Sequence, residues 1–141
     1  MILPDANVLL YAVNSASEHH QLARKAMADS FGQARGVAFA WTALLAFLRL
    51  STRAGIFERP LKVEQALQVV AHWLDQPRAH TVHPTSKHRE VLGRLLLGAG
   101  VAGNLTSDAH LAALAIEHGA TVLTFDRDFE RFAGLRWETP K

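Results

Sequence analysis

Short apolar runs alternate with amphipathic stretches along this chain. The runs at 1–3, 37–40 and 121–125 have the length and continuity of buried strands, and weaker strand signals lie at 81–82 and 135–139. Between them, apolar residues recur at helical spacing in the segments 6–13, 20–31, 42–54, 63–74, 91–96 and 108–118. This alternation of strands and helices predicts an α/β fold around a mainly parallel sheet.

The composition predicts one globular domain over residues 1–141. Apolar residues make up 49% of the chain and charged residues 20%, which is enough to build a core at this length. The chain has no cysteine, which excludes disulfides, thiolate zinc sites and thiol nucleophiles. The N-terminus has no basic leader, and the longest apolar stretch, Trp41–Leu48, is too short to cross a bilayer. We therefore expect a cytoplasmic protein that does not enter a membrane.

Charge is unevenly distributed, although the formal net charge is only +2. The acids discussed below lie towards the two ends of the chain, whereas the middle is rich in basic residues, namely Arg35, Arg49, Arg53, Arg59, Lys62, Lys87, Arg89 and Arg94. A basic surface around an acidic pocket would bind a polyanion through its phosphates. Charges scattered over a solvated surface are an equally good interpretation of the composition alone.

Three aspartates end apolar runs in widely separated parts of the chain. Asp5 and Asp126 directly follow predicted strands, and the carboxyl ends of parallel strands share one edge of a sheet. Asp108 opens a predicted helix three and four residues before Leu111 and Ala112, so it shares their inward side. Each aspartate could instead be an ordinary helix N-cap, but three carboxylates on one edge repel one another unless a cation or a proton lies between them. Together they predict a shared metal site.

The expected metal is Mg²⁺ or Mn²⁺, because oxygen ligands without cysteine favour hard cations over zinc. The eight histidines of the chain do not change this expectation. His19 and His20 are adjacent and diverge on a helix, and His110 lies on the wrong side of its helix to share a metal with Asp108. We expect the histidines at surface or packing positions.

The segments that carry these aspartates resemble a known family. They are Asp5–Tyr11 (DANVLLY), Asn104–Ala115 (NLTSDAHLAALA) and Thr124–Phe129 (TFDRDF). In this order and spacing they are similar to the PIN-domain ribonucleases, and among them to the VapC toxins of bacterial type II toxin-antitoxin pairs. The resemblance extends over essentially the whole chain.

The resemblance implies a three-layer α/β/α sandwich and a Mg²⁺- or Mn²⁺-dependent endoribonuclease that hydrolyses RNA with a metal-activated water. It further implies a homodimer and a small cognate antitoxin protein. Asp5, Asp108 and Asp126 match catalytic, metal-binding acids of the family, and Asp128 would be a neighbouring ligand. Asn7 and Asn104 match supporting positions.

The chain departs from the family pattern in the predicted helix 42–54. Members usually carry an acid there, commonly Glu, whereas Leu44, Ala46 or Phe47 occupies the place here, depending on register. The loss would weaken metal binding, restrict the site to one ion or abolish cleavage. Glu58 lies beyond this helix and is a poor substitute. We expect Leu44, Leu45 and Leu48 to form the inward side of the helix.

Three further residues have two interpretations each. Arg49 lies in the same helix and either contacts an RNA phosphate or is a solvated helix charge. Trp41 and Trp73 either stack on RNA bases or, as their apolar spacing favours, belong to the core.

Two rival functions remain. An aspartate-nucleophile phosphotransferase would want a second carboxylate where Asn7 stands and a lysine at a later strand end, but no lysine occurs between Lys87 and Lys141. A PIN-like module that binds RNA or a protein without cutting is the stronger rival, because the helix acid is missing.

Overall fold

The fold is organised around a parallel β-sheet. The computed structural model describes residues 1–100 and 103–141, and within them the sheet has five strands in the order β3-β2-β1-β4-β5. All neighbouring strands are parallel. The strands are β1 (Ile2–Pro4), β2 (Val37–Phe39), β3 (Ala79–Thr81), β4 (Thr121–Leu123) and β5 (Trp137–Glu138). The predicted parallel sheet is confirmed, and the weak signal at 135–139 corresponds to an edge strand.

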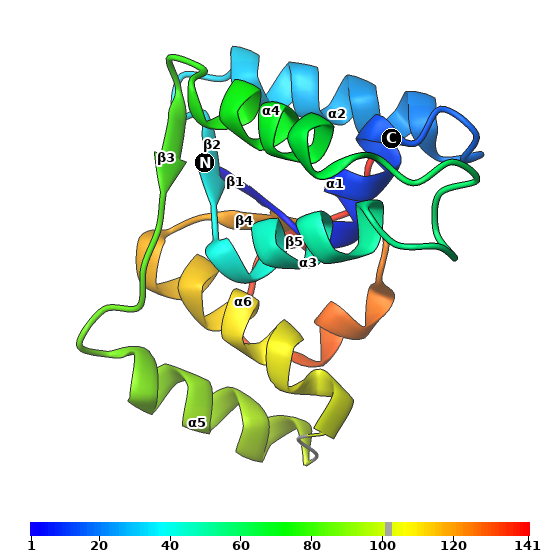
Figure 1. The fold of residues 1–141 in the computed structure, drawn as a ribbon. Helices are drawn as coiled ribbons and strands as arrows, with labels where there is room; N and C mark the ends of the chain where they lie inside the picture. The colour runs from blue at the N-terminus through cyan, green and yellow to red at the C-terminus, as the bar shows by residue number, and fades with distance from the viewer. Residues whose placement is uncertain (101–102) are drawn as a thin grey trace.

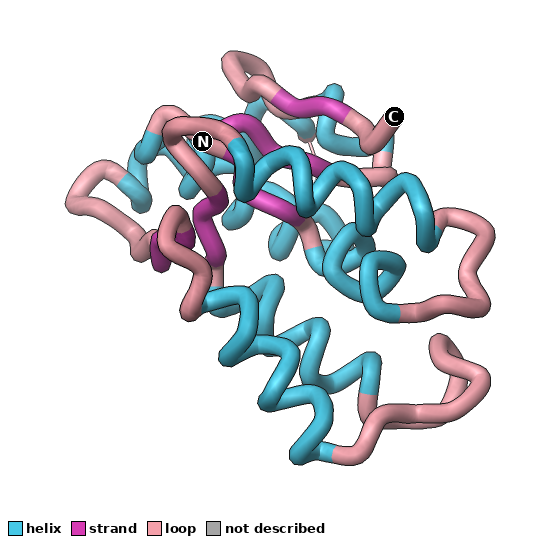
Figure 2. Tube along the Cα trace, turned by 90° about the horizontal axis from the view of Figure 1, so that it is seen from above, coloured by secondary structure: helices cyan, strands magenta, loops and turns pink. Residues whose placement is uncertain are grey.

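Helices cover both faces of this sheet (Figure 1 and Figure 2). One layer consists of α1 (Ala6–Val13), α2 (His20–Gly32), α3 (Trp41–Ser51) and α4 (Val63–Leu74). The other consists of α5 (His88–Ala99), α6 (Thr106–His118) and the short 3₁₀ helices η1 (Gly103–Leu105) and η2 (Arg127–Arg131). The predicted three-layer α/β/α sandwich is therefore confirmed. Among the described residues, no helix has the length and apolarity needed to span a membrane.

The alternation of side chains along each strand divides the core in two. In β1, Ile2 contributes to the core beneath α1–α4, whereas Leu3 contributes to the core beneath α6. In β4, Leu123 and Val122 are divided between the two cores in the same way. Successive side chains of a strand point to opposite faces, so short apolar runs are what a sheet covered on both sides requires.

The prediction that Leu45 of α3 faces inward with Leu44 is wrong, because Leu45 is 55% exposed. The buried side of α3 is made by Ala43, Leu44, Phe47 and Ser51. Phe47 packs edge-on against Trp73 of α4, with ring centroids 4.9 Å apart. The large aromatic side chain gains more from burial than a leucine, and this contact turns Leu45 towards the solvent.

Candidate active site

The carboxyl ends of β1 and β4 meet at the point where the strand order reverses. These two strands are neighbours in register, with Pro4 opposite Leu123, and the backbone N–H of Asp5 donates to the carbonyl of Leu123 at 2.9 Å. The chain leaves β1 towards β2 on one side, whereas β4 and β5 extend the sheet on the other. Such a switch point in a parallel sheet is a common place for a ligand site.

Asp5 is held at this edge by a set of hydrogen bonds. Its Oδ1 accepts from the backbone N–H of Ala6 at 2.8 Å, so Asp5 caps α1 as well as facing the edge. Its Oδ2 accepts from the hydroxyl of Thr124 at 2.8 Å and from the amide of Asn7 at 3.2 Å. The Oδ1 of Asn7 accepts in turn from the backbone N–H of Phe125 at 3.2 Å. The carboxylate therefore has a fixed orientation, and Asn7 lies where a supporting residue would be needed.

Asp126 is linked to the same network. Its backbone N–H donates to Thr124 Oγ1 at 3.0 Å, and its Oδ1 accepts from the backbone N–H of Asp128 at 2.9 Å, which caps η2. Asp128 itself is exposed, and its carboxylate lies 4.0 Å from Arg131. Asp126 thus lies beside Asp5, whereas Asp128 belongs to the solvated margin of the site.

Asp108 reaches the same site from the opposite layer. It lies in the first turn of α6 but does not cap that helix, because the N-cap position is Leu105. Asp108 and Asp5 line one cavity of about 370 Å³, whose other wall is part of α3. Burial raises the pKa of Asp108 to about 7, and the negative charges of Asp5, Asp126 and Asp128 contribute to this shift. Asp5 and Asp108 thus share one cavity, whereas Asp126 does not line it and is close enough only for its charge to act on both.

Burial also disfavours the charged form of Asp5. Burial raises its pKa above the ordinary value, the hydrogen bonds from Thr124 and Ala6 oppose this shift, and the charge of Asp126 adds to it. Neither carboxylate forms an ion pair within the described residues, so two groups with raised pKa values make a site with excess negative charge. Such a site gains stability when a cation binds.

The donor set fits a hard divalent cation in part. The converging donors are carboxylate oxygens, which Mg²⁺ and Mn²⁺ prefer. Within residues 1–100 and 103–141, however, no three His, Asp or Glu side chains are close enough together to hold an ion ready-made. Mg²⁺ commonly takes only one or two carboxylates and completes its shell with water and substrate phosphate. Asp5 and Asp108, on one cavity, are the two that would hold it.

The side chains of α3 that line the cavity show which position corresponds to the acid that is missing from this helix. Leu44 and Phe47 are fully buried in the core, so neither stands where a ligand would be needed. Ala46 lines the cavity together with Thr42 and Arg49. Ala46 is therefore the position from which an acid would face Asp5 and Asp108. Glu58 lies at a separate surface hollow with Tyr11 and Asn14, and does not substitute.

The two tryptophans considered for RNA stacking differ sharply. Trp73 is 7% exposed and packs against Phe39 and Phe47, so it belongs to the core. Trp41 is 43% exposed at the start of α3, next to the cavity-lining Thr42. The core interpretation is confirmed for Trp73 only.

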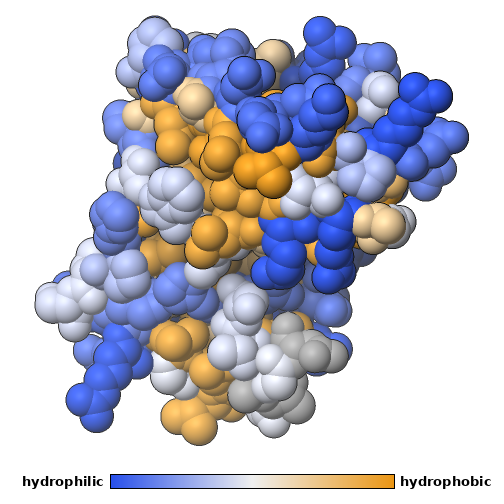
Figure 3. Space-filling model, viewed as in Figure 1, coloured by the Kyte–Doolittle hydropathy of each residue, from blue (hydrophilic) through white to orange (hydrophobic). Residues whose placement is uncertain are grey.

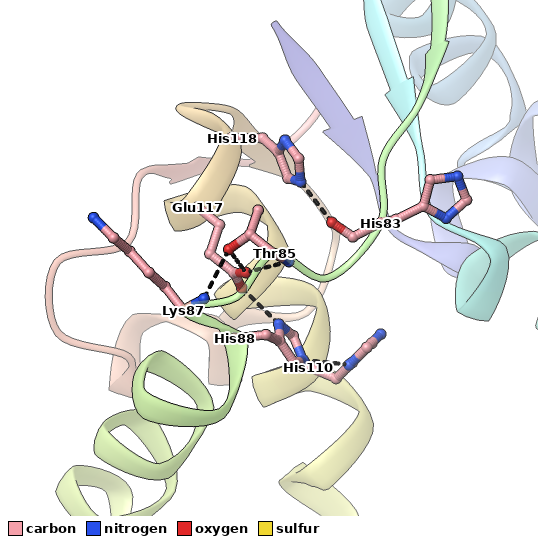
Figure 4. Close-up of polar contacts among 7 residues, drawn as sticks. All are labelled: His83, Thr85, Lys87, His88, His110, Glu117 and His118. Carbon is pink, nitrogen blue, oxygen red and sulfur yellow. Dashed lines mark hydrogen bonds and ion pairs between the residues drawn. The ribbon is translucent and has the colours of Figure 1, made fainter.

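Away from the cavity, a polar cluster joins α5 to α6 (Figure 4). Glu117 accepts from the backbone N–H of Thr85 at 2.9 Å, from its hydroxyl at 2.6 Å and from His88 Nδ1 at 2.5 Å. The other ring nitrogen of His88 lies 2.9 Å from Nδ1 of His110. His88 and His110 are packing histidines, as expected for the histidines of this chain. Glu117, whose side chain is only 1% exposed, received no role from the sequence.

Sequence reasoning also missed Thr124. Its side chain is fully buried and contacts Asp5, Asn7 and Asp126. One signal in the sequence could have indicated it: Thr124 is a hydroxyl residue between an apolar run and an aspartate. At a buried strand end such a hydroxyl has few hydrogen-bond partners other than neighbouring polar side chains. For Asn104, the backbone belongs to η1, but its side chain lies outside the described residues, and its supporting role stays a prediction.

Comparisons with known proteins point to one family. The family model of the PIN domain matches residues 2–135. Ribonuclease VapC37 of Mycobacterium tuberculosis is 50% identical over 140 residues, which cover 99% of this chain and 97% of that protein.

Two solved structures share the fold at low sequence identity. The crystal structure of VapBC2 from Rickettsia felis, bound to a DNA fragment from its promoter, gives a TM-score of 0.70 at 21% identity and covers 100% of both chains. That of VapC20 from Mycobacterium tuberculosis, a toxin that cleaves the sarcin-ricin loop, gives 0.70 at 19% identity, with coverage of 96% of this chain and 99% of that one.

Proposed function

This chain belongs to the PIN-domain family, and from that premise we propose that it is an endoribonuclease toxin of a type II toxin-antitoxin pair, dependent on Mg²⁺ or Mn²⁺. The observation that carries the proposal is the shared cavity of Asp5 and Asp108, in which the charges of Asp126 and Asp128 also act on Asp108. Excess negative charge beside the basic Arg49 suits a cation and a phosphodiester together.

Each residue has a distinct role in this proposal. Asp5 and Asp108 would hold the divalent ion, and Asp126 and Asp128 would add negative charge at its margin. A divalent ion held there would polarise the phosphodiester and would supply an activated water for its hydrolysis. Asn7 and Thr124 fix the orientation of the Asp5 carboxylate through their hydrogen bonds. Arg49, exposed on the cavity wall, would bind a phosphate oxygen of the RNA.

The proposed partners follow from the family. A cognate antitoxin protein would bind this chain and suppress its activity, as implied by its similarity to VapC proteins and a VapBC complex. A homodimer is proposed on the same basis. Co-expression with the neighbouring reading frame, followed by size-exclusion chromatography with light scattering, measures both associations.

The presence of Ala46 in place of an acid favours a second candidate function. Because no acid faces the cavity from α3 at this position, the chain could bind RNA without cutting it. Among the described residues that line the cavity, Asp5 and Asp108 are then the acids that remain to hold an ion. RNA binding that persists without cleavage would identify this alternative.

A cleavage assay distinguishes the two functions. The purified chain is incubated with structured RNA and Mg²⁺ or Mn²⁺, with and without a chelator, beside Asp5→Asn. Cleavage that the chelator and Asp5→Asn both abolish supports the nuclease. RNA binding by the folded wild-type chain without cleavage in either metal would favour the binding module, and circular dichroism of Asp5→Asn excludes unfolding as the cause of lost activity.

A further inference from the structure

Three exposed or cavity-lining side chains form one row along α3. Trp41, Leu45 and Arg49 are spaced four residues apart, so they lie on one side of the helix. The rise of an α-helix spreads this row over about 12 Å. Trp41 is 43% and Leu45 55% exposed, and Arg49 is exposed as well. The row, called here the α3 ridge, runs from an aromatic group through an aliphatic one to a cation.

The α3 ridge borders the catalytic carboxylates directly. Leu45 and Arg49 line the cavity that Asp5 and Asp108 share, and Trp41 precedes Thr42, which lines it too. Among the described residues that line this cavity, Arg49 is the one cation. A substrate phosphate at the carboxylates would therefore have Arg49 beside it and the two apolar groups further along the same helix.

The indole of Trp41 has no stacking partner among the described residues, unlike that of Trp73. Burial of a large aromatic group against a binding partner stabilises a complex more than burial of most side chains does. Single-stranded nucleic acids are bound by this combination of an aromatic platform for bases and cations for phosphates.

We propose that the α3 ridge is a subsite for single-stranded RNA next to the cleaved bond. A base stacks on the indole of Trp41, Leu45 provides apolar contact between base and cavity, and Arg49 binds the adjoining phosphate. The inference rests on the proposed nuclease function, and it adds that the preferred substrate is unpaired where it contacts α3, because a paired and stacked base offers no free face.

A protein partner is the competing occupant. Apolar side chains gather over α3 and α4 on the face shown in Figure 3, and Val63 and Leu67 of α4 are 59% and 51% exposed. The observations favour RNA for the α3 ridge itself, because Leu45 and Arg49 are walls of the cavity that the substrate must enter. The aliphatic Val63 and Leu67 lie on the neighbouring helix and provide no cation.

Fluorescence measures the subsite directly. Asp5→Asn, which we expect to leave the RNA uncut, is titrated in Mg²⁺ with a random single-stranded RNA of about eight nucleotides, a length within the range that such sites cover. We expect quenching of tryptophan fluorescence. Adding Trp41→Ala should weaken binding by about tenfold to a hundredfold, the loss typical of one stacked base, while Trp41→Phe should retain most of the affinity. Arg49→Ala should lower the salt dependence of log affinity by about one unit.

The matched control is Val63→Ala, which truncates an apolar side chain off the ridge that is exposed even more than Trp41 (59% against 43%) and should leave RNA affinity unchanged. A Trp41→Ala protein that is folded by circular dichroism yet binds the RNA as tightly as its parent would overturn the subsite. So would loss of antitoxin binding by Trp41→Ala with unchanged RNA affinity, which would assign the ridge to a protein partner. If the wild-type chain binds RNA through Trp41 but does not cleave it, the nuclease function fails and the subsite stands.

Discussion

The hydroxyl of Thr124 donates a hydrogen bond of 2.8 Å to Oδ2 of Asp5, across 119 residues of sequence. The same oxygen of Thr124 accepts from the backbone N–H of Asp126 at 3.0 Å. One buried hydroxyl therefore connects two of the acids that were expected to share a site. It opposes the effect of burial on Asp5, because a hydrogen bond donated to a carboxylate favours its charged form.

Replacing Thr124 by valine keeps the shape of the side chain and removes this hydroxyl. We expect a loss of about 1–3 kcal/mol in the free energy of unfolding, because the backbone N–H of Asp126 and the Asp5 oxygen lose a partner. The pKa of Asp5 should rise further, and cleavage should weaken at neutral pH. Chemical denaturation and a pH–rate profile measure both effects. Thr124→Ser, which keeps the hydroxyl, is the control, and an unchanged pH–rate profile in Thr124→Val would contradict the role of the hydrogen bond.

The raised pKa of Asp108 predicts how stability depends on pH. The carboxyl protonates near pH 7 in the folded chain and near its ordinary value of 3.8 when unfolded. The folded state therefore binds the proton more tightly, so this contribution to stability is complete below about pH 3.8 and is lost as the pH rises through 7. Without added metal, Asp108→Asn should be more stable than the wild-type chain at pH 8, and the difference should shrink towards pH 4.

Thermal unfolding at pH 4, 6 and 8, with and without Mg²⁺, measures this difference. Mg²⁺ at pH 8 should raise the melting temperature of the wild-type chain and have little effect on Asp108→Asn, because binding to the folded state alone stabilises it. Asp75→Asn, which neutralises an exposed acid at the end of α4, is the control. Equal pH dependence in wild-type and Asp108→Asn would show that Asp108 does not titrate as described.

The cavity wall identifies where an acid can be restored. Ala46→Glu places a carboxylate on the cavity opposite Asp5 and Asp108, whereas Leu44→Glu would bury a charge in the core. We expect Ala46→Glu to tighten Mn²⁺ binding and raise the cleavage rate, and to lower stability when no metal is present, because it adds a like charge. Leu44→Glu should unfold the chain or destabilise it by several kcal/mol.

Calorimetric titration with Mn²⁺ and the RNA cleavage assay test this pair. Ala28→Glu adds the same charge to an exposed position of α2 and controls for a change in net charge. If Ala46→Glu binds Mn²⁺ no better than Ala28→Glu does, the cavity does not need an acid from α3.

The positions of Asp5 at a strand end and of Asp108 in the first turn of a helix could be predicted from the sequence, because local patterns fix strand ends and helix starts. Asp5 and Asp126 follow apolar runs, and a parallel sheet brings such ends to one edge without further information. Sequence reasoning failed where packing between elements decides the outcome. The choice of Phe47 over Leu45 as an inward residue depends on Trp73 of another helix. The partners of Thr124 and Glu117 lie up to 119 residues away along the chain, so no local pattern shows them.

The contacts of Glu117 predict a structural role that can be separated from catalysis. Burial alone would raise the pKa of this carboxyl, but hydrogen bonds from Thr85 and His88 outweigh it and hold the pKa below its ordinary value of 4.5. The stabilisation is therefore present above pH 4.5 and is lost as the pH falls through the lower pKa of the folded state. Glu117→Gln should lose about 1.5–3 kcal/mol at pH 7, the range for hydrogen bonds to a charged group.

Thr85 lies just before α5, and His88 is its first residue. Glu117→Gln should therefore loosen that helix first. Hydrogen exchange should show faster amide exchange in α5 than in β1 and β4, while the cleavage rate of the protein that remains folded stays close to the wild-type value. Glu90→Gln, an exposed acid of α5 itself, should change neither quantity. If exchange instead accelerated equally in the central strands, α5 and α6 would unfold together with the sheet, and Glu117 would stabilise the whole domain and not the attachment of one helix.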